Sequence, residues 1–143
     1  VNCAADFSNE DFIIFRKDGL FAYQLAVVVD DDFQGITHAI RGCDLLESTV
    51  RQMSLFQILN KSVPNFGHIP LAVTAQGYKL SKQNNAPAIN INKPQASLIK
   101  ALKFLGQQPP KELITYSTKD IIQWAIQHWQ RSLIPNQREI SLE

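Results

Sequence analysis

The chain has 143 residues, of which 45% are apolar and 19% charged, and its formal net charge at pH 7 is +1. This length fits one domain with a real core, and the composition is that of a soluble globular protein. The small net charge excludes a strong overall field for nucleic acid, so any RNA contact has to be local.

Apolar runs and cysteines point to the cytoplasm. The longest apolar run, Leu25–Val29, is far too short to span a bilayer, and no signal peptide is visible. The two cysteines, Cys3 and Cys43, form neither a disulfide framework nor a zinc-binding spacing. We expect two reduced thiols in a cytoplasmic protein.

The chain opens with a polar end over residues 1–10. Phe12–Arg16 is apolar and rich in β-formers, and Lys17–Gly19 closes it, which predicts a buried strand and a turn. Leu20–Val29 is ambiguous, because its three consecutive valines favour a strand while Phe21, Leu25 and Val28 share one helical face. We expect a helix, because the neighbouring segments require a crossover. Asp30–Asp32 then fall in a solvated turn, with a cation site as the alternative.

A second strand and a helix follow the break at Gly35. Ile36–Ile40 has an alternating pattern of side chains, which predicts a short strand. Asp44–Leu59 has apolar residues at helical spacing, with Asp44 as the N-cap and Glu47 three residues on as an acidic capping box.

A third strand is predicted at Ile69–Val73, after a loop marked by Pro64 and Gly67. The order strand, helix, strand, helix, strand implies parallel pairing with right-handed crossovers. The fold class is therefore α/β.

The second half of the chain predicts a loop and two helices. Gln83–Gln95 is rich in Asn and Pro, which predicts a loop. Ala96–Leu105 has apolar residues at helical spacing, which predicts a helix. Ser117 or Thr118 caps a final helix over Lys119–Trp129. The last dozen residues read as a tail.

Arg41 and Tyr23 are the first candidate site residues. Arg41 ends a predicted parallel strand, where open α/β sheets bind ligands, and its guanidinium suits a carboxylate. The alternative is a structural arginine that caps a helix or pairs with Asp44. Tyr23 presents its hydroxyl at the same edge, or else it is a core aromatic residue.

The histidines indicate no separate site. His38, His68 and His128 are too dispersed for a metal site or a Ser-His-Asp set. The chain also has no glycine-rich phosphate loop of a standard kind.

Residues 79–83, Lys-Leu-Ser-Lys-Gln, follow a strand-like run and a short turn. Lys79 and Lys82 lie three residues apart with Ser81 between them. Such a loop can place two cationic charges on a polyphosphate whose charge is being redistributed. Taken alone, Lys79–Lys82 is also compatible with an ordinary solvated loop.

Four blocks in one order resemble the second half of the catalytic core of glutamyl-type class I aminoacyl-tRNA synthetases. The resemblance covers residues 11–85, and Lys79–Lys82 resembles the second signature of that class. The other three blocks, in chain order, are Asp18–Asp31, Gly35–Gly42 with its continuation to Thr49, and His68–Leu71.

Two features resemble one branch, the glutamyl-queuosine tRNA(Asp) synthetases. The signature continues with Gln83, and the chain ends soon after it with a tail that includes Lys103–Gln108. An ordinary glutamyl-tRNA synthetase cut before its anticodon-binding region is the second interpretation. The third is a non-catalytic RNA- or protein-binding module derived from such a core.

The resemblance implies an enzyme that activates glutamate with ATP and Mg²⁺ and passes it to queuosine in the anticodon of tRNA(Asp). It implies that Tyr23 and Arg41 bind the glutamate and that Lys79 and Lys82 neutralise the phosphates. Asp44, His68 and Ser81 are further candidates.

The family's first ATP signature, its N-terminal glutamate contacts and its cysteine-rich zinc segment would all lie before Val1. We therefore expect a C-terminal fragment that is inactive alone, has no metal site of its own and needs the N-terminal half of its catalytic domain. Residues 1–85 are expected to form the C-terminal half of a Rossmann-like catalytic domain. Residues 86–143 are expected to form a short helical region.

Overall fold

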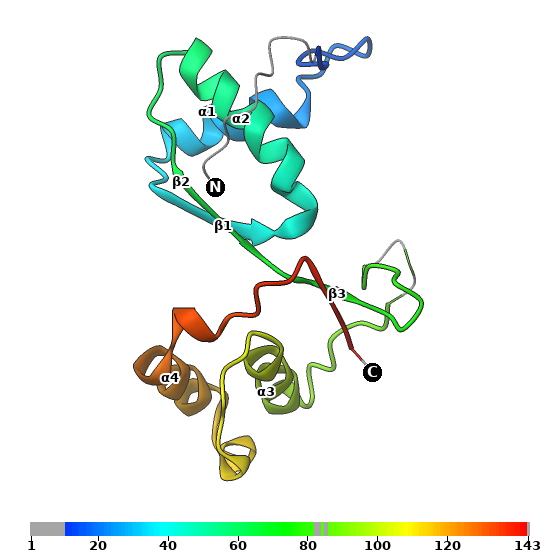
Figure 1. Ribbon diagram of the computed structural model, residues 1–143, viewed down its shortest axis with the longest axis vertical. Helices are drawn as coiled ribbons and strands as arrows, with labels where there is room; N and C mark the ends of the chain where they lie inside the picture. Colours follow the sequence, from blue (N-terminus) through cyan, green and yellow to red (C-terminus); the bar gives the residue numbers. More distant parts are fainter. Residues whose placement is uncertain (1–10, 82–83, 85, 143) are drawn as a thin grey trace. The chain divides into compact units, whose positions relative to one another are not determined.

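The computed structural model describes residues 11–81, 84 and 86–142. The chain folds as two compact units, divided between His68 and Ile69 (Figure 1). Among the described residues, no helix is both long enough and apolar enough to span a membrane.

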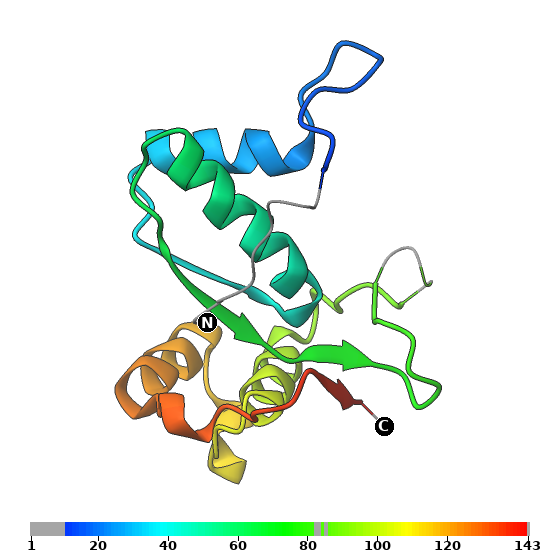
Figure 2. The same cartoon turned by 45° about the horizontal axis from the view of Figure 1, so that its top comes forward.

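The first unit combines two packed helices with two paired strands (Figure 2). Helices α1 and α2 lie side by side, and strand β1 is the neighbour of β2. The elements are α1 (Tyr23–Phe33), β1 (His38–Gly42), a 3-10 turn (Cys43–Leu45), α2 (Leu46–Ile58) and β2 (Asn65–Ile69).

Strands β1 and β2 run in parallel. The backbone N–H of Asn65 donates to the carbonyl of Thr37 at 2.9 Å, and Ile40 lies against Gly67. The two contacts occur in the same residue order on both strands, as in a parallel pair. Helix α2 is the crossover between them, so a strand–helix–strand unit forms as predicted. Its second strand is β2 rather than the predicted Ile69–Val73, because Leu71–Val73 belongs to a separate two-stranded sheet.

The core of the first unit forms between the helices and the strands. Val28 of α1 is fully buried and packs with two residues of α2, Leu55 and Phe56. The predicted helix after Gly19 is confirmed, because Val28 faces this core in helical rather than strand geometry. Partly buried side chains complete the cluster: Phe12, Val27 and Phe66.

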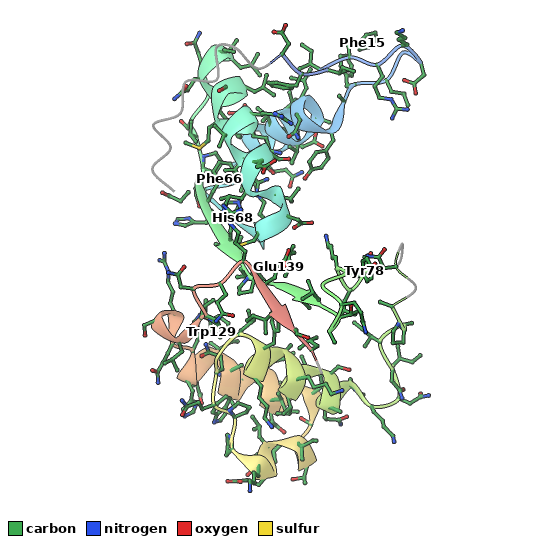
Figure 3. All side chains as sticks on the ribbon, turned by 45° about the vertical axis from the view of Figure 1, so that its right-hand side comes forward. Phe15, Phe66, His68, Tyr78, Trp129 and Glu139 are labelled. Carbon is green, nitrogen blue, oxygen red and sulfur yellow. The ribbon has the colours of Figure 1, made fainter. Side chains whose placement is uncertain are left out.

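The predicted buried strand at Phe12–Arg16 is wrong. Ile13 and Phe15 are exposed, and the segment makes one isolated antiparallel bridge, between Phe15 and Phe21. The turn at Lys17–Gly19 does form, so the segment closes on itself as a short loop with Phe15 near its tip (Figure 3). A strand needs a neighbouring sheet to bury it, and the described residues supply none here.

The predicted turn at Asp30–Asp32 is also wrong, because these residues form the last part of α1. The unfavourable charge at the helix C-terminus is relieved by exposure to water and by an ion pair between Asp32 and Lys61 at 2.9 Å. Gly35 then ends the segment with a positive φ of 67°.

Two local predictions around α2 are corrected. Leu45 is the N-cap of α2, with no side-chain cap, and Asp44 lies in the preceding 3-10 turn. Gly67 lies within β2 rather than in a loop, and a Cβ at this position would come 2.6 Å from Cδ1 of Ile40. Strand β1 also lies two residues later than predicted.

The second unit is a helical cluster beside a small parallel sheet. Both helices predicted in this half form, and Ser117 caps the second by accepting from the N–H of Asp120 at 3.2 Å. Ile99, Leu102, Leu113 and Ile121 are its buried core. Its elements are β3 (Leu71–Val73), α3 (Pro94–Phe104), 3-10 turns (Lys111–Thr115, Arg131–Leu133), α4 (Thr118–His128) and β4 (Glu139–Ser141).

The predicted C-terminal tail is wrong over residues 139–141. This segment is β4, which pairs in parallel with β3, and Glu139 lies opposite Leu71 (Figure 3). The N–H of Leu142 also donates to the carbonyl of Val73 at 2.9 Å. The strand exists because β3 offers it a partner, which the local sequence does not reveal.

Candidate active site

Arg41 lies at the carboxyl end of β1 and anchors a polar network inside the first unit. Its Nη1 donates to Oε1 of Gln52 at 2.6 Å, and its Nη2 donates to Oγ1 of Thr49 at 2.9 Å. Both acceptors come from the buried face of α2, where Thr49 and Gln52 are each only 1% exposed. The two partners are neutral, so neither compensates the charge of the guanidinium.

The hydroxyl of Thr49 joins three groups. It donates its single proton to the carbonyl of Leu45 at 2.8 Å, so it accepts from Arg41 and from His68. The Nε2 atom of His68 lies 2.8 Å from this hydroxyl and must therefore carry the hydrogen. A neutral His68 then has its lone pair on Nδ1.

Two buried atoms of the network have no hydrogen-bond partner among the described residues, namely Nε of Arg41 and Nδ1 of His68. One is a donor and the other an acceptor. Buried polar groups without partners are uncommon and gather where a ligand or water completes the site.

Arg41 stacks on an aromatic ring, and burial lowers the pKa of both Arg41 and His68. The guanidinium carbon of Arg41 lies 4.5 Å from the centroid of the Phe66 ring, and Phe66 and His68 lie two residues apart on β2 (Figure 3). Burial lowers the pKa of Arg41, while Tyr23 and Asp31 act in the opposite sense. Burial also lowers the pKa of His68, and the charge of Arg41 lowers it further.

Tyr23 is the first residue of α1 and is 55% exposed. This exposure rules out the interpretation of Tyr23 as a core aromatic residue. Tyr23 raises the pKa of Arg41. His68 is joined to Arg41 through the hydroxyl of Thr49.

Arg41 donates to two side chains of α2, a structural contact that differs from the predicted helix cap or pair with Asp44. Asp44 lies in the 3-10 turn directly after β1. It remains a neighbour of Arg41 in sequence, at the same end of the strand.

Lys79 and Ser81 belong to the second unit, and Lys82 lies outside the described residues. Lys79 is exposed and follows a tight turn in which the N–H of Gly77 donates to the carbonyl of Thr74 at 2.9 Å. Gly77 has a φ of 83°, which favours glycine at this turn. The turn returns Lys79 to an antiparallel bridge with Val73 at the end of β3.

A family model described as tRNA synthetases class I (E and Q), catalytic domain, matches residues 1–138. The chain belongs to this family. The predicted resemblance is therefore confirmed at the level of the family, and the match extends across both compact units.

Curated relatives confirm the resemblance to one branch of these class I synthetases. A protein of Colwellia psychrerythraea named Glutamyl-Q tRNA(Asp) synthetase is 62% identical over the whole chain, which covers 47% of that relative. A protein of the same name from Escherichia coli K12 is 53% identical over 90% of the chain, which covers 42% of it. The chain thus spans less than half the length of either relative.

A solved structure shows the same fold. The crystal structure of a glutamate-tRNA synthetase from Elizabethkingia anophelis aligns with a TM-score of 0.65 and 22% identity, covering 94% of this chain and 30% of that one. At this identity the similarity supports the fold of the class I synthetase domain and nothing finer.

Local sequence does not reveal three residues of the polar network, namely Thr49, Gln52 and Gln24. A signal was present, because Thr49 and Gln52 are polar residues on the helix face that covers Arg41. A buried face that carries a hydroxyl and an amide requires a polar partner opposite it.

Within residues 11–81, 84 and 86–142, no three His, Cys, Asp or Glu side chains gather as a metal site. Cys43 is a free, half-buried thiol, and Cys3 lies outside the described residues.

Proposed function

We propose that the chain is part of a glutamyl-queuosine tRNA(Asp) synthetase, which activates glutamate with ATP and transfers it to queuosine in the anticodon of tRNA(Asp). The observation that carries this proposal is the identity of 62% and 53% to two relatives named for that activity. The guanidinium of Arg41, which donates to two neutral side chains, provides the chemical support.

Arg41 binds a carboxylate of glutamate in this proposal. A guanidinium has five N–H donors, and Arg41 uses one on Gln52 and one on Thr49. The Nε–H and one hydrogen on each terminal nitrogen are left for a ligand. Tyr23, exposed beside this group, contacts the same glutamate with its hydroxyl.

Lys79 and Lys82 neutralise the phosphates as pyrophosphate leaves, and Ser81 lies between them. Mg²⁺ comes with the ATP phosphates as their counter-ion. Catalysis then consists mainly of positioning and charge stabilisation, with little covalent work for the side chains. Asp44 and His68 support the arginine end of the site.

The rest of the active site comes from the part of the full-length protein that corresponds to the uncovered half of the relatives. We propose that residues 1–85 form the C-terminal half of a Rossmann-like catalytic domain, that residues 86–143 form a helical region, and that the chain alone is inactive. Any zinc site belongs to the part of the catalytic domain outside this chain. The proposed reaction takes place in the cytoplasm, where its tRNA is found.

The test is transfer of radiolabelled glutamate by the full-length protein. This is either the native gene product that carries the chain or a chimaera completed with the corresponding part of the Colwellia relative. Labelling of tRNA(Asp) that carries queuosine, with none of queuosine-free tRNA(Asp) or tRNA(Glu), supports the proposal. Labelling of tRNA(Glu) instead identifies an ordinary glutamyl-tRNA synthetase, and labelling of no tRNA favours a binding module.

A further inference from the structure

A chain of side-chain amides links Arg41 to helix α1. Oε1 of Gln52 accepts from Arg41 at 2.6 Å, and Nε2 of Gln52 donates to Oε1 of Gln24 at 2.8 Å. Nε2 of Gln24 in turn donates to Oγ of Ser48 at 3.1 Å. Every donor in this chain points away from Arg41, so its polarity is consistent from one end to the other.

The polarity of this chain fixes the orientation of Gln52. If its amide were reversed, its NH₂ group would face an N–H of Arg41, and two donors would meet. Arg41 only donates, so it requires the oxygen of Gln52 on its side, and Gln24 accepts from the NH₂ group that this leaves on the other side. Gln52 is 1% exposed, so water is not available to replace either partner.

We propose that Gln52 is a positioning residue for glutamate binding, which holds the guanidinium of Arg41 in place and couples it through Gln24 to the start of α1. The inference rests on the proposed function, in which Arg41 and Tyr23 bind the same glutamate. Gln24 is the residue next to Tyr23 on α1. The amide chain therefore fixes the two glutamate contacts as one unit, although they lie on different elements.

The neutrality of Gln52 is part of the same role. A carboxylate at this position would hold Arg41 equally well, yet it would compensate the charge that the substrate carboxylate needs. An amide fixes the geometry of the arginine and adds no negative charge beside it. Thr49, also neutral, does the same for the other terminal nitrogen.

Two variants separate position from charge. Gln52→Met keeps the length of the side chain and removes both hydrogen bonds. Gln52→Glu keeps an acceptor for Arg41 and adds a negative charge, and the amide of Gln24 can turn to donate to it. Gln57→Met, at an exposed position of the same helix, is the matched control.

The measurement is glutamate-dependent ATP–pyrophosphate exchange by the full-length protein, with KM for glutamate, KM for ATP and kcat determined separately. We expect both Gln52 variants to raise KM for glutamate by about tenfold or more, with KM for ATP and kcat changed by less than about threefold. Gln57→Met should have the same KM for glutamate, KM for ATP and kcat as the unmodified protein.

A purely structural Gln52 gives a different result. In that case the variants lower kcat with the folded fraction and leave KM for glutamate unchanged, which overturns the inference and leaves the proposed function intact. If the unmodified protein shows no exchange with glutamate, the proposed function fails and the inference fails with it.

Discussion

The guanidinium of Arg41 lies over the ring of Phe66, with Cζ 4.5 Å from the ring centroid. Because the two residues come from neighbouring strands, the stack fixes one face of the guanidinium. Thr49 and Gln52 then fix its rotation within the plane. The arginine is thus held in one orientation before any ligand arrives, which lowers the entropy cost of binding a carboxylate.

Arg41→Lys should weaken glutamate binding although it keeps the charge. A lysine ammonium is a point charge and cannot hold Thr49, Gln52 and a carboxylate in one planar fork. Since hydrogen bonds to charged groups contribute about 1.5–3 kcal/mol, we expect KM for glutamate to rise about 10- to 100-fold. Arg16→Lys, at an exposed position outside the network, is the control and should leave KM unchanged. An unchanged KM in Arg41→Lys would remove Arg41 from the glutamate site.

Lys79→Ala should act on the rate rather than on glutamate binding. Its proposed role is to stabilise charge that develops on the phosphates, so we expect kcat to fall by about 10- to 100-fold. KM for glutamate should stay within about twofold. Lys79 is exposed, so the substitution should not disturb folding. Lys100→Ala, exposed on α3, is the matched control, and an equal loss in that variant would contradict a specific role for Lys79.

His68 should make the stability of the chain depend on pH. Its pKa is lowered by burial and by Arg41, so the folded state binds its proton less readily than the unfolded state. Stability from this group is complete above the ordinary histidine pKa of about 6.5 and is lost as the pH falls through the lowered folded value.

Urea unfolding between pH 5 and pH 8 tests this dependence. His68→Gln keeps an N–H for Thr49 and removes the titration, so this variant should lose less stability on acidification than the unmodified chain. His38→Gln, at an exposed position of β1, serves as the control. If the free energy of unfolding depends on pH identically in the unmodified chain and in His68→Gln, His68 does not contribute to the pH dependence of stability.

Two isoleucines of α4 should differ sharply in their effect on stability. Ile121 is 1% exposed and packs in the core of the second unit, whereas Ile126 is 68% exposed. Ile121→Ala should lower the free energy of unfolding by about 2–5 kcal/mol. Ile126→Ala should change it by less than about 0.5 kcal/mol. Equal effects in chemical denaturation would show that the packing of α4 differs from that described.

The elements that the sequence predicted well are those with strong local periodicity. Helix α2 follows from its apolar spacing, and α4 follows from the same spacing and its Ser117 cap. The position of Arg41 at the end of a strand also follows from the local pattern. These features depend on residues that are close together along the chain.

The failures depend on distant partners. Phe12–Arg16 has the composition of a strand yet finds no sheet to join, whereas β4 forms because β3 lies beside it. Gln24 and Gln52 are joined across two helices, so neither shows its role in local sequence. Tertiary contacts decide such cases, and local propensity does not encode them.

The most direct test of the central claim is ATP–pyrophosphate exchange with glutamate by the full-length protein in the absence of tRNA. The proposed glutamyl-queuosine branch resembles enzymes that activate glutamate unaided. We therefore predict glutamate-dependent exchange without tRNA, and its loss in Arg41→Lys at low glutamate. Exchange that appears only when tRNA(Glu) is added would contradict this account and would identify an ordinary glutamyl-tRNA synthetase.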